Sequence, residues 1–220
     1  MFKKFGTCGF DSRMPTVTRD EMLEPLAAPL RDLVTWLSGG RIPFVIIGGV
    51  AASLQGEARF TGDIDAVVMT DESKLEEFLK DAKLHGFSPR RADPIGFARA
   101  NRIVLLVHDA DAMNVDLSLG ILPFEQEMIE RAVRVSELGM EIPIAAPEEL
   151  IAMKVLAFRG RDITDIEGLL DANPGIDMAR VWRWVHGLAE GLESPEIADR
   201  LKLLLAKREE RGSTRNKSDA

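Results

Sequence analysis

The chain has 220 residues, of which 45% are hydrophobic and 29% are charged, and its formal net charge is -8. This composition is typical of a globular protein that buries a sizeable core, in one domain or in one domain with a small appendage. No apolar run reaches the roughly 20 residues that a membrane-spanning helix needs, and no apolar stretch typical of a signal peptide follows the first lysines. We therefore predict no membrane partner.

The residue types that are rare in the chain also limit its chemistry. Cys8 is the single cysteine, which excludes an intrachain disulfide and favours a reducing compartment, by default the cytoplasm. Tyrosine is absent, so no tyrosine serves as a nucleophile or proton donor. The acidic net charge opposes binding to nucleic acid on average, although a local basic patch can override that average.

The first part of the chain predicts helices and strands in alternation. Residues 1–16 have no periodicity and are expected to be flexible. Thr18 and Glu21 form a capping box that predicts the start of a helix ending at Gly39-Gly40. Further elements are expected from hydrophobic periodicity and β-branched runs: strands at 43–47, 63–69, 102–108 and 113–119, two short strands around 133–144, and helices at 50–54, 71–84 and 123–132.

From Pro147 onward the pattern is helical throughout. Helices are predicted over residues 147–158, 162–172, 177–190 and 195–210, and the polar residues 211–220 are expected to be a flexible tail. The predicted fold class is therefore α+β. It has a sheet-containing core at residues 17–145 and an all-helical C-terminal subdomain at residues 146–210.

Carboxylates on two predicted strands are the first chemical signal. Asp63 and Asp65 are two residues apart, so on a strand they point to the same face, where they repel each other unless a cation neutralises them. Asp116 alternates with Val115 and Leu117 on a later strand. If the two strands are neighbours, three carboxylates can hold two Mg²⁺ ions, or Mn²⁺ in their place, as in two-metal phosphoryl transfer. A single Asp-x-Asp by itself is more often a solvated strand end.

Gly48-Gly49 lies between a predicted strand and a predicted short helix. Glycines at this position let a phosphate approach the backbone closely, and the N-terminus of a helix offers unpaired N–H groups to an anion. A lone Gly-Gly is far more often an ordinary tight turn between a strand and a helix. The combination with the aspartates is what distinguishes this pair.

Gly48-Gly49, Asp63-x-Asp65 and Asp116 together resemble the signature of the polymerase-beta-like nucleotidyltransferase superfamily, over roughly residues 40–120. The resemblance implies a mixed sheet flanked by helices and the transfer of a nucleoside monophosphate from an NTP such as ATP. It also implies that the two glycines contact the triphosphate and that the three aspartates bind the catalytic metal ions.

A second block of charged residues follows on the C-terminal helices. Lys154 lies on an amphipathic helix that Gly160 is expected to break, and acidic residues suit the start of the next helix. On spacing alone a helix cap and a solvated face explain the block equally well. The residues of the block are Lys154, Arg159, Arg161, Asp162 and Asp165.

This block resembles the nucleotidyltransferase toxins of abortive-infection-type toxin–antitoxin systems. The resemblance implies that Lys154 and an arginine contact the nucleotide phosphates, and that Asp162 or Asp165 orients these cations or acts as a base. It also implies an antitoxin protein as a partner.

Other polar residues give weaker signals. Arg59 and Thr61 precede Asp63 in a loop, where the arginine either holds the γ-phosphate or is simply solvated. A modest basic cluster could steer an RNA or an NTP, but a solvated face is the simpler interpretation. Its members are Arg90, Arg91, Arg99 and Arg102. The three histidines are scattered without metal-ligand spacing and are interpreted as structural or surface residues.

The sequence thus predicts a nucleotidyltransferase whose acceptor hydroxyl belongs to an RNA end, a protein or a small molecule. The alternative is a catalytically weak nucleotide-binding regulatory or antitoxin-like module with the same fold. All three carboxylates are present, and this favours the enzyme, because an inactive copy need not retain them.

Overall fold

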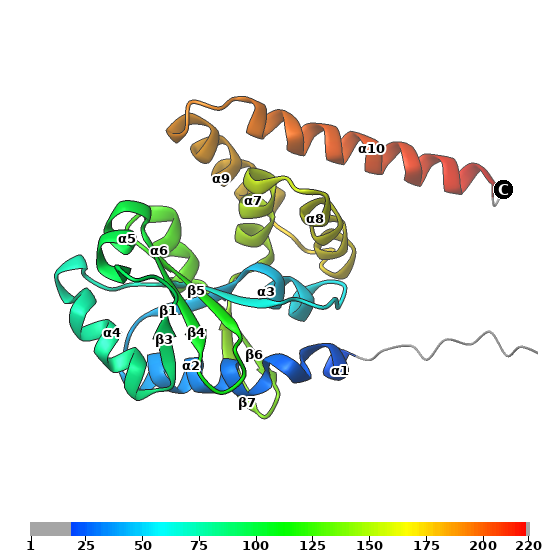
Figure 1. Cartoon of the computed structure of the whole chain (residues 1–220). Coiled ribbons are helices and arrows are strands. Elements are labelled where there is room, and N and C mark those ends of the chain that lie inside the picture. Colours follow the sequence, from blue (N-terminus) through cyan, green and yellow to red (C-terminus); the bar gives the residue numbers. More distant parts are fainter. Residues whose placement is uncertain (1–18, 219–220) are drawn as a thin grey trace, which may run out of the picture.

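The computed structural model describes residues 19–218, with side chains for residues 21–211, and consists of one mixed sheet with helices on both faces (Figure 1). Cys8, Thr18 and the segment 1–16 lie outside the described residues. None of the described helices combines the length and the apolar character needed to cross a membrane.

The sheet has seven strands in the order β3-β4-β5-β2-β1-β7-β6. The pairs β2–β5 and β1–β7 are parallel and the other neighbours are antiparallel, which confirms the expected mixed sheet. The strands are β1 (Phe44–Ile47), β2 (Asp63–Val68), β3 (Phe87–Pro89), β4 (Ile103–His108), β5 (Asn114–Leu119), β6 (Val133–Glu137) and β7 (Met140–Ile144).

The helices follow the predicted order, with some differences in their bounds. Those before the C-terminal group are α1 (Arg19–Leu23), the 3-10 helix η1 (Glu24–Leu26), α2 (Ala27–Gly39), α3 (Gly48–Gln55), the 3-10 helix η2 (Glu72–Lys74), α4 (Leu75–Leu84), α5 (Pro94–Asn101) and α6 (Pro123–Glu130). The C-terminal group comprises α7 (Pro147–Ala157), α8 (Gly160–Ala172), α9 (Met178–Gly191) and α10 (Glu196–Ser218).

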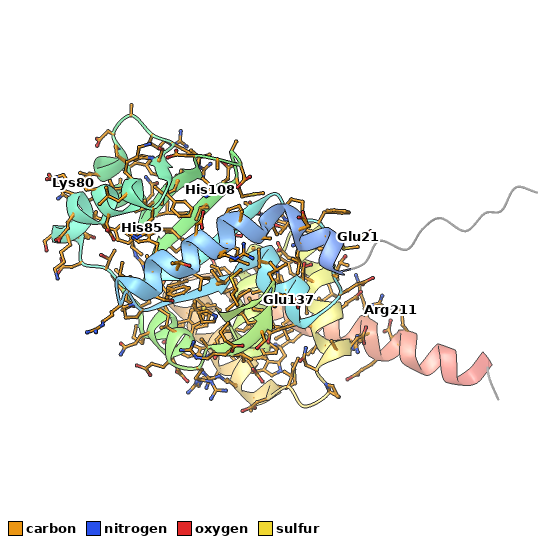
Figure 2. All side chains as sticks on the ribbon, turned by 90° about the horizontal axis from the view of Figure 1, so that it is seen from below. Glu21, Lys80, His85, His108, Glu137 and Arg211 are labelled. Atoms are coloured by element: carbon orange, nitrogen blue, oxygen red, sulfur yellow. The ribbon has the colours of Figure 1, made fainter. Side chains whose placement is uncertain are left out.

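Helices α2 and α4 cover one face of the sheet. Trp36 of α2 is fully buried, lies 5.0 Å from the ring of Phe78 and 5.5 Å from that of Phe87, and donates a hydrogen bond of 2.7 Å to Asp81. Seen from below, α2 crosses the sheet with His85 and His108 beside it (Figure 2). His108 is buried, with Asp32 of α2 at 3.0 Å. It is therefore a structural residue, as predicted.

The C-terminal helices lie over the opposite face, above α3 (Figure 1). Their apolar residues join the same hydrophobic cluster as the sheet, with Leu150, Ile166 and Val185 buried at its centre. Trp182 and Trp184 are partly buried and pack against this cluster. The sheet and the C-terminal helices are thus packed together through one continuous apolar core.

Three local predictions need correction. The predicted first helix is interrupted by η1, where Pro25 lacks the N–H that a continuous α-helix would use. Helix α7 ends at Ala157 because Phe158 adopts a left-handed conformation (φ 47°), whereas Gly160 begins α8 and does not break α7. The last helix continues through Ser218, beyond the predicted end at residue 210. Strand β3 and helix α5 were not predicted, because both are too short to show a clear period.

Replacing Trp36 tests the packing of α2 on the sheet. The Trp36→Ala variant should lose about 3–5 kcal/mol in its free energy of unfolding, because a fully buried ring leaves a cavity. Urea unfolding measures this loss. Leu84→Ala serves as the control, since Leu84 is 84% exposed and its truncation should change stability by less than about 0.5 kcal/mol. Similar stability of the two variants would contradict the described packing.

Candidate active site

Two parallel neighbouring strands carry the three aspartates. In the register of β2 and β5, Asp65 lies opposite Asp116, and Asp63 lies opposite Asn114. Residues paired in register, and residues two apart on a strand, point to the same face of a sheet. Ile64, between the two aspartates of β2, is fully buried on the other face. The predicted convergence of the three carboxylates on one face of a single sheet is confirmed.

The crowding of like charges is visible in the pKa of Asp65. Burial, together with the carboxylates of Asp63 and Asp116, raises this pKa to about 6. Lys154 and Arg161 act in the opposite direction without cancelling the rise. The ionised Asp65 carboxylate therefore lacks full compensation from the protein, and a nearby cation would stabilise it.

The third aspartate does have a counter-ion from the protein. Arg90 forms an ion pair with Asp116 through a guanidinium nitrogen, and its Nε donates a hydrogen bond of 2.8 Å to the carbonyl of Leu106. Burial and Asp63 raise the pKa of Asp116, whereas Arg90 opposes the rise. The expectation of a solvated Arg90 was wrong. The residue follows β3 directly, and this short strand brings it to the carboxylate.

The rest of the predicted basic cluster does not reach the aspartates in the same way. Arg102 pairs with Glu125 at 2.7 Å, and the guanidinium of Arg91 lies over the ring of Phe97 at 4.8 Å. The cluster is therefore divided among separate local contacts.

The two glycines create space for the site's own side chains. Helix α3 begins at Gly48, whose φ of +66° is in the left-handed region, and a Cβ there would overlap the carboxylate of Asp65. A Cβ on Gly49 would lie 2.5 Å from Oγ1 of Thr61, which in turn donates a hydrogen bond of 3.0 Å to Asp63. The structure thus gives the Gly-Gly pair a role that the sequence did not suggest, namely the seating of Asp65 and Thr61.

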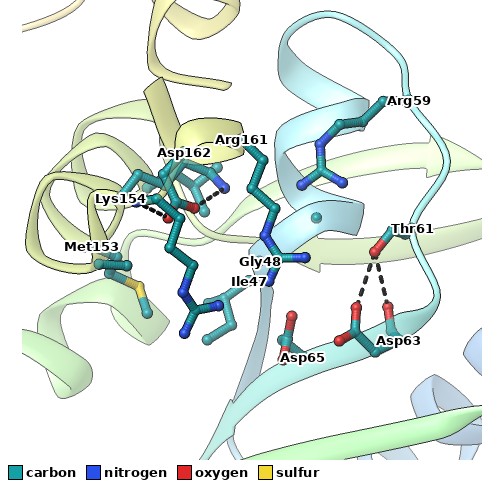
Figure 3. Close-up of a pocket in the computed structure, with 14 residues that line it drawn as sticks. Ile47, Gly48, Arg59, Thr61, Asp63, Asp65, Met153, Lys154, Arg161 and Asp162 are labelled. Atoms are coloured by element: carbon teal, nitrogen blue, oxygen red, sulfur yellow. Dashed lines mark hydrogen bonds and ion pairs between the residues drawn. The ribbon is translucent and has the colours of Figure 1, made fainter. Parts of the chain in front are cut away.

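A cavity of about 220 Å³ lies between the end of β1, the start of β2 and the C-terminal helices α7 and α8 (Figure 3). Lys154 lines the same cavity as Asp63 and Asp65, although it comes from helix α7 and they come from β2. The polar and glycine residues that line the cavity are Gly48, Gly49, Arg59, Thr61, Asp63, Asp65, Lys154, Arg159, Arg161 and Asp162.

Asp165 links two of the predicted phosphate-binding cations. Its oxygens accept hydrogen bonds from Nε and a terminal nitrogen of Arg59, at 2.7 and 2.9 Å, and one from Nζ of Lys154 at 2.5 Å. Burial alone would raise the pKa of Asp165, but the hydrogen bonds from Arg59 and Lys154 outweigh burial and lower the pKa. A carboxylate with a lowered pKa is a poor general base, so Asp165 fits the orienting role better.

Asp162 has a different function in the fold. It accepts a hydrogen bond of 2.8 Å from the backbone N–H of Arg159 and so caps the start of α8, as acidic residues at this position commonly do. It also lies 3.7 Å from Nζ of Lys154. The structure therefore separates the two aspartates, with Asp165 as the main partner of the cations and Asp162 as a cap.

Arg159 and Arg161 are the cations of the cavity wall that are most available to a ligand. Both are exposed, and neither forms an ion pair with a carboxylate of the described residues. In Figure 3 the side chain of Arg161 extends over Gly48 toward Asp65. An anionic ligand in this cavity would therefore meet two arginines that need not break an existing ion pair.

The carboxylates suit Mg²⁺ even though the described residues contain no group of three acidic, histidine or cysteine side chains ready to hold a metal. Mg²⁺ in nucleotide enzymes usually takes one or two carboxylates and completes its shell with water and substrate phosphates. Asp63 and the under-compensated Asp65 supply such a pair of oxygen donors. Asp116 is adjacent in register, but Arg90 engages it.

Residues 22–185 match the protein family described as "Nucleotidyltransferase of unknown function (DUF6036)". The chain belongs to this family. It is therefore a nucleotidyltransferase, and the α+β fold with its seven-stranded mixed sheet agrees with that assignment. No curated protein sequence matches the chain.

Several solved structures are similar to parts of this chain. The solution structure of the antibiotic-resistance factor ANT(2'')-Ia is similar with a TM-score of 0.55 at 14% identity, over 80% of this chain and 97% of that one. An antigenic nucleotidyltransferase-like protein from Paracoccidioides brasiliensis has a TM-score of 0.49 at 18% identity, over 81% of this chain and 93% of that one. At such identities the likeness concerns the fold.

Replacing Gly48 tests its role in seating Asp65. Gly48→Ala should lower the free energy of unfolding by about 1–3 kcal/mol, because the new Cβ meets the Asp65 carboxylate in a backbone conformation that alanine disfavours. Urea unfolding is the measurement. The control is Gly187→Ala on α9, where a Cβ meets nothing within 4 Å and alanine should be neutral or stabilising. Equal effects at both positions would contradict the proposed packing.

The raised pKa of Asp65 predicts a pH-dependent stability. Between about pH 4 and pH 6 the folded protein retains a proton on Asp65 that the unfolded chain releases, so the free energy of unfolding falls as the pH rises through this window. In metal-free buffer, Asp65→Asn should therefore be more stable than the wild type at pH 7, by up to about 3 kcal/mol, and nearly equal to it at about pH 3.5.

Urea unfolding at both pH values, with a chelator present, measures this difference. Asp199→Asn is the matched control, since the Asp199 side chain is 73% exposed on α10 and does not line the cavity. A wild type more stable than Asp65→Asn at pH 7 would show that Asp65 has a stabilising structural partner instead.

Proposed function

We propose that this protein transfers a nucleoside monophosphate from an NTP to an acceptor hydroxyl and releases pyrophosphate, with Asp63, Asp65 and Asp116 as ligands of two Mg²⁺ ions. One observation carries the proposal: three carboxylates share one face of the sheet, and Asp65 has no full counter-charge. A purely structural site would not gather like charges without compensation, because their repulsion opposes folding.

When bound, the metal ions would neutralise the triphosphate and lower the pKa of the acceptor hydroxyl. The protein's own residues orient the donors. Thr61 holds Asp63 through its hydroxyl, and Gly48 leaves room for Asp65 to stand beside the start of α3. This preorganisation reduces the rearrangement needed when charge develops in the transition state.

The cavity supports a triphosphate site. The first N–H groups of α3 and the exposed guanidinium groups of Arg159 and Arg161 can hold phosphate oxygens at the same wall. Arg59 and Lys154 add further positive charge, and their hydrogen bonds to Asp165 fix their positions. This arrangement stabilises the extra charge on the phosphates as the bond to the leaving pyrophosphate breaks.

The acceptor hydroxyl would belong to an RNA end, a protein side chain or a small molecule. The fold's likeness to an antibiotic-resistance factor is compatible with a small-molecule acceptor. The similarity of the Lys154–Asp165 block to toxin nucleotidyltransferases supports a toxin role with an antitoxin partner. Both are refinements of the same proposed chemistry.

One observation favours a second candidate, a nucleotide-binding regulatory module with weak turnover. Arg90 occupies Asp116, and an arginine permanently fixed there would block one of the two metal sites. Metal-dependent consumption of NTP by the purified protein separates the two functions, because the regulatory module would bind NTP but consume little of it.

Removing either β2 carboxylate tests the proposed function. Asp63→Asn and Asp65→Asn should each reduce pyrophosphate release by at least about a hundredfold, because an amide cannot offset the charge of a divalent ion. The assay measures pyrophosphate with Mg²⁺ and each of the four NTPs. The acceptor panel contains RNA, protein and small hydroxyl compounds, since a missing acceptor would imitate an inactive enzyme.

Asp199→Asn again provides the matched control and should keep wild-type turnover. Thermal melts in chelator establish that the variants are folded. Undiminished pyrophosphate release from a folded Asp63→Asn or Asp65→Asn variant would refute the metal-ligand role.

A further inference from the structure

We propose that Arg90 is a positioning residue that forms an ion pair with Asp116 while the second metal ion is absent. Arg90 must leave this carboxylate before that ion binds. The inference rests on the proposed function, because it concerns the same metal site. It predicts that the two ions bind unequally: one to Asp63 and Asp65 without hindrance, and one to Asp116 only in exchange for Arg90.

The three carboxylates differ in the side chains that contact them. Asp116 is ion-paired with Arg90, and Asp63 accepts a hydrogen bond from the hydroxyl of Thr61. No side chain of the described residues donates a hydrogen bond to Asp65 (Figure 3 shows Asp63 and Asp65 on β2). The carboxylates on β2 are therefore open to a metal cation, whereas Asp116 on β5 is already paired with the guanidinium of Arg90.

The position of Arg90 is built into the sheet. Its backbone N–H donates to the carbonyl of Leu105 at 2.9 Å, and its Nε donates to the carbonyl of Leu106 at 2.8 Å. Leu105 is the cross-strand partner of Asp116. These two hydrogen bonds to β4 direct the guanidinium toward the carboxylate on β5, at the other side of β4. The backbone of the sheet therefore fixes the position of this ion pair.

The pair can nevertheless open. The side chains of Arg90 and Asp116 are 28% and 27% exposed, so water screens the pair and can solvate a released guanidinium. A divalent ion and a guanidinium cannot share the Asp116 carboxylate cheaply, because like charges at short range repel. Arg90 thereby competes with the second ion while the site is empty, and it compensates Asp116 until that ion arrives.

Mn²⁺ binding to the full chain, without NTP or acceptor, tests this proposal. Free Mn²⁺ is measured by electron paramagnetic resonance during a titration, and the wild type should show one tighter and one weaker site. Arg90→Gln should strengthen the weaker site about three- to tenfold and leave the tighter site unchanged, since it removes both the ion pair and a positive charge. Arg90→Lys keeps the positive charge but loses the planar guanidinium group. The Mn²⁺ affinity of its weaker site should therefore lie between that of the wild type and that of Arg90→Gln.

Two further variants make the test specific. Arg91→Gln removes the neighbouring positive charge, whose guanidinium lies over Phe97, and should leave both sites as in the wild type. In an Asp116→Asn background, Arg90→Gln should have no effect on Mn²⁺, because the carboxylate for which they compete is gone. Thermal melts with and without Mn²⁺ verify folding, and Arg90→Lys replaces Arg90→Gln in the comparison if the latter does not fold.

Two equally tight sites in the wild type would overturn the proposal. It would also be overturned if the second site bound Mn²⁺ more weakly in Arg90→Gln than in the wild type, because Arg90 would then orient Asp116 for the ion. A persistent effect of Arg90→Gln in the Asp116→Asn background would also overturn it. Absence of any Mn²⁺ site in the wild type would instead refute the proposed function, and this inference with it. The two failures are therefore distinguishable.

Discussion

The repulsion among three carboxylates on one sheet face is the constraint to which the rest of the site responds. The parallel register of β2 and β5 places Asp65 beside Asp116, and the two-residue period of β2 adds Asp63. Each carboxylate is accommodated by the residues next to it. Arg90 compensates Asp116, the missing side chain of Gly48 gives Asp65 room, and burial leaves Asp65 with a pKa near 6. In the proposed function, divalent cations would complete the compensation of these carboxylates.

A second group of charges, on the C-terminal helices, is balanced within the protein. Asp165 is almost fully buried and binds both Arg59 and Lys154, so it connects the loop before β2 with α7 and α8. Such a buried network contributes position more than stability, because desolvation of the charges offsets much of their attraction. It keeps the wall of the cavity opposite Asp63 and Asp65 in a defined place. The balanced network thus fixes the cavity wall, and in the proposed function the unbalanced carboxylates would bind the metal ions.

The order of the strands gives the site two sides. The Gly-Gly start of α3 follows β1, on one side of the aspartates, and the cavity with Arg159 and Arg161 opens there. Arg90 lies at the end of β3, on the other side, beyond β4 and β5. In the proposed reaction the triphosphate occupies the first side, which leaves the side of Asp116 and Arg90 to the acceptor. The contact of Arg90 with Asp116 therefore lies at the point where the two substrates would meet.

The sequence by itself determined the local features. These are the alternation that places Asp63 and Asp65 on one face of a strand and Ile64 on the other, the Gly-Gly turn before a short helix, and the run of C-terminal helices. These follow from periods of 2 and 3.6 residues and from turn chemistry, which act within a few residues. Tertiary structure decided which distant groups meet. Arg59 reaches Asp165 across 106 positions of the chain, and Arg90 reaches Asp116 because a three-residue strand pairs with β4. No local pattern encodes such contacts, since they depend on strand register and on how the helices pack over the sheet.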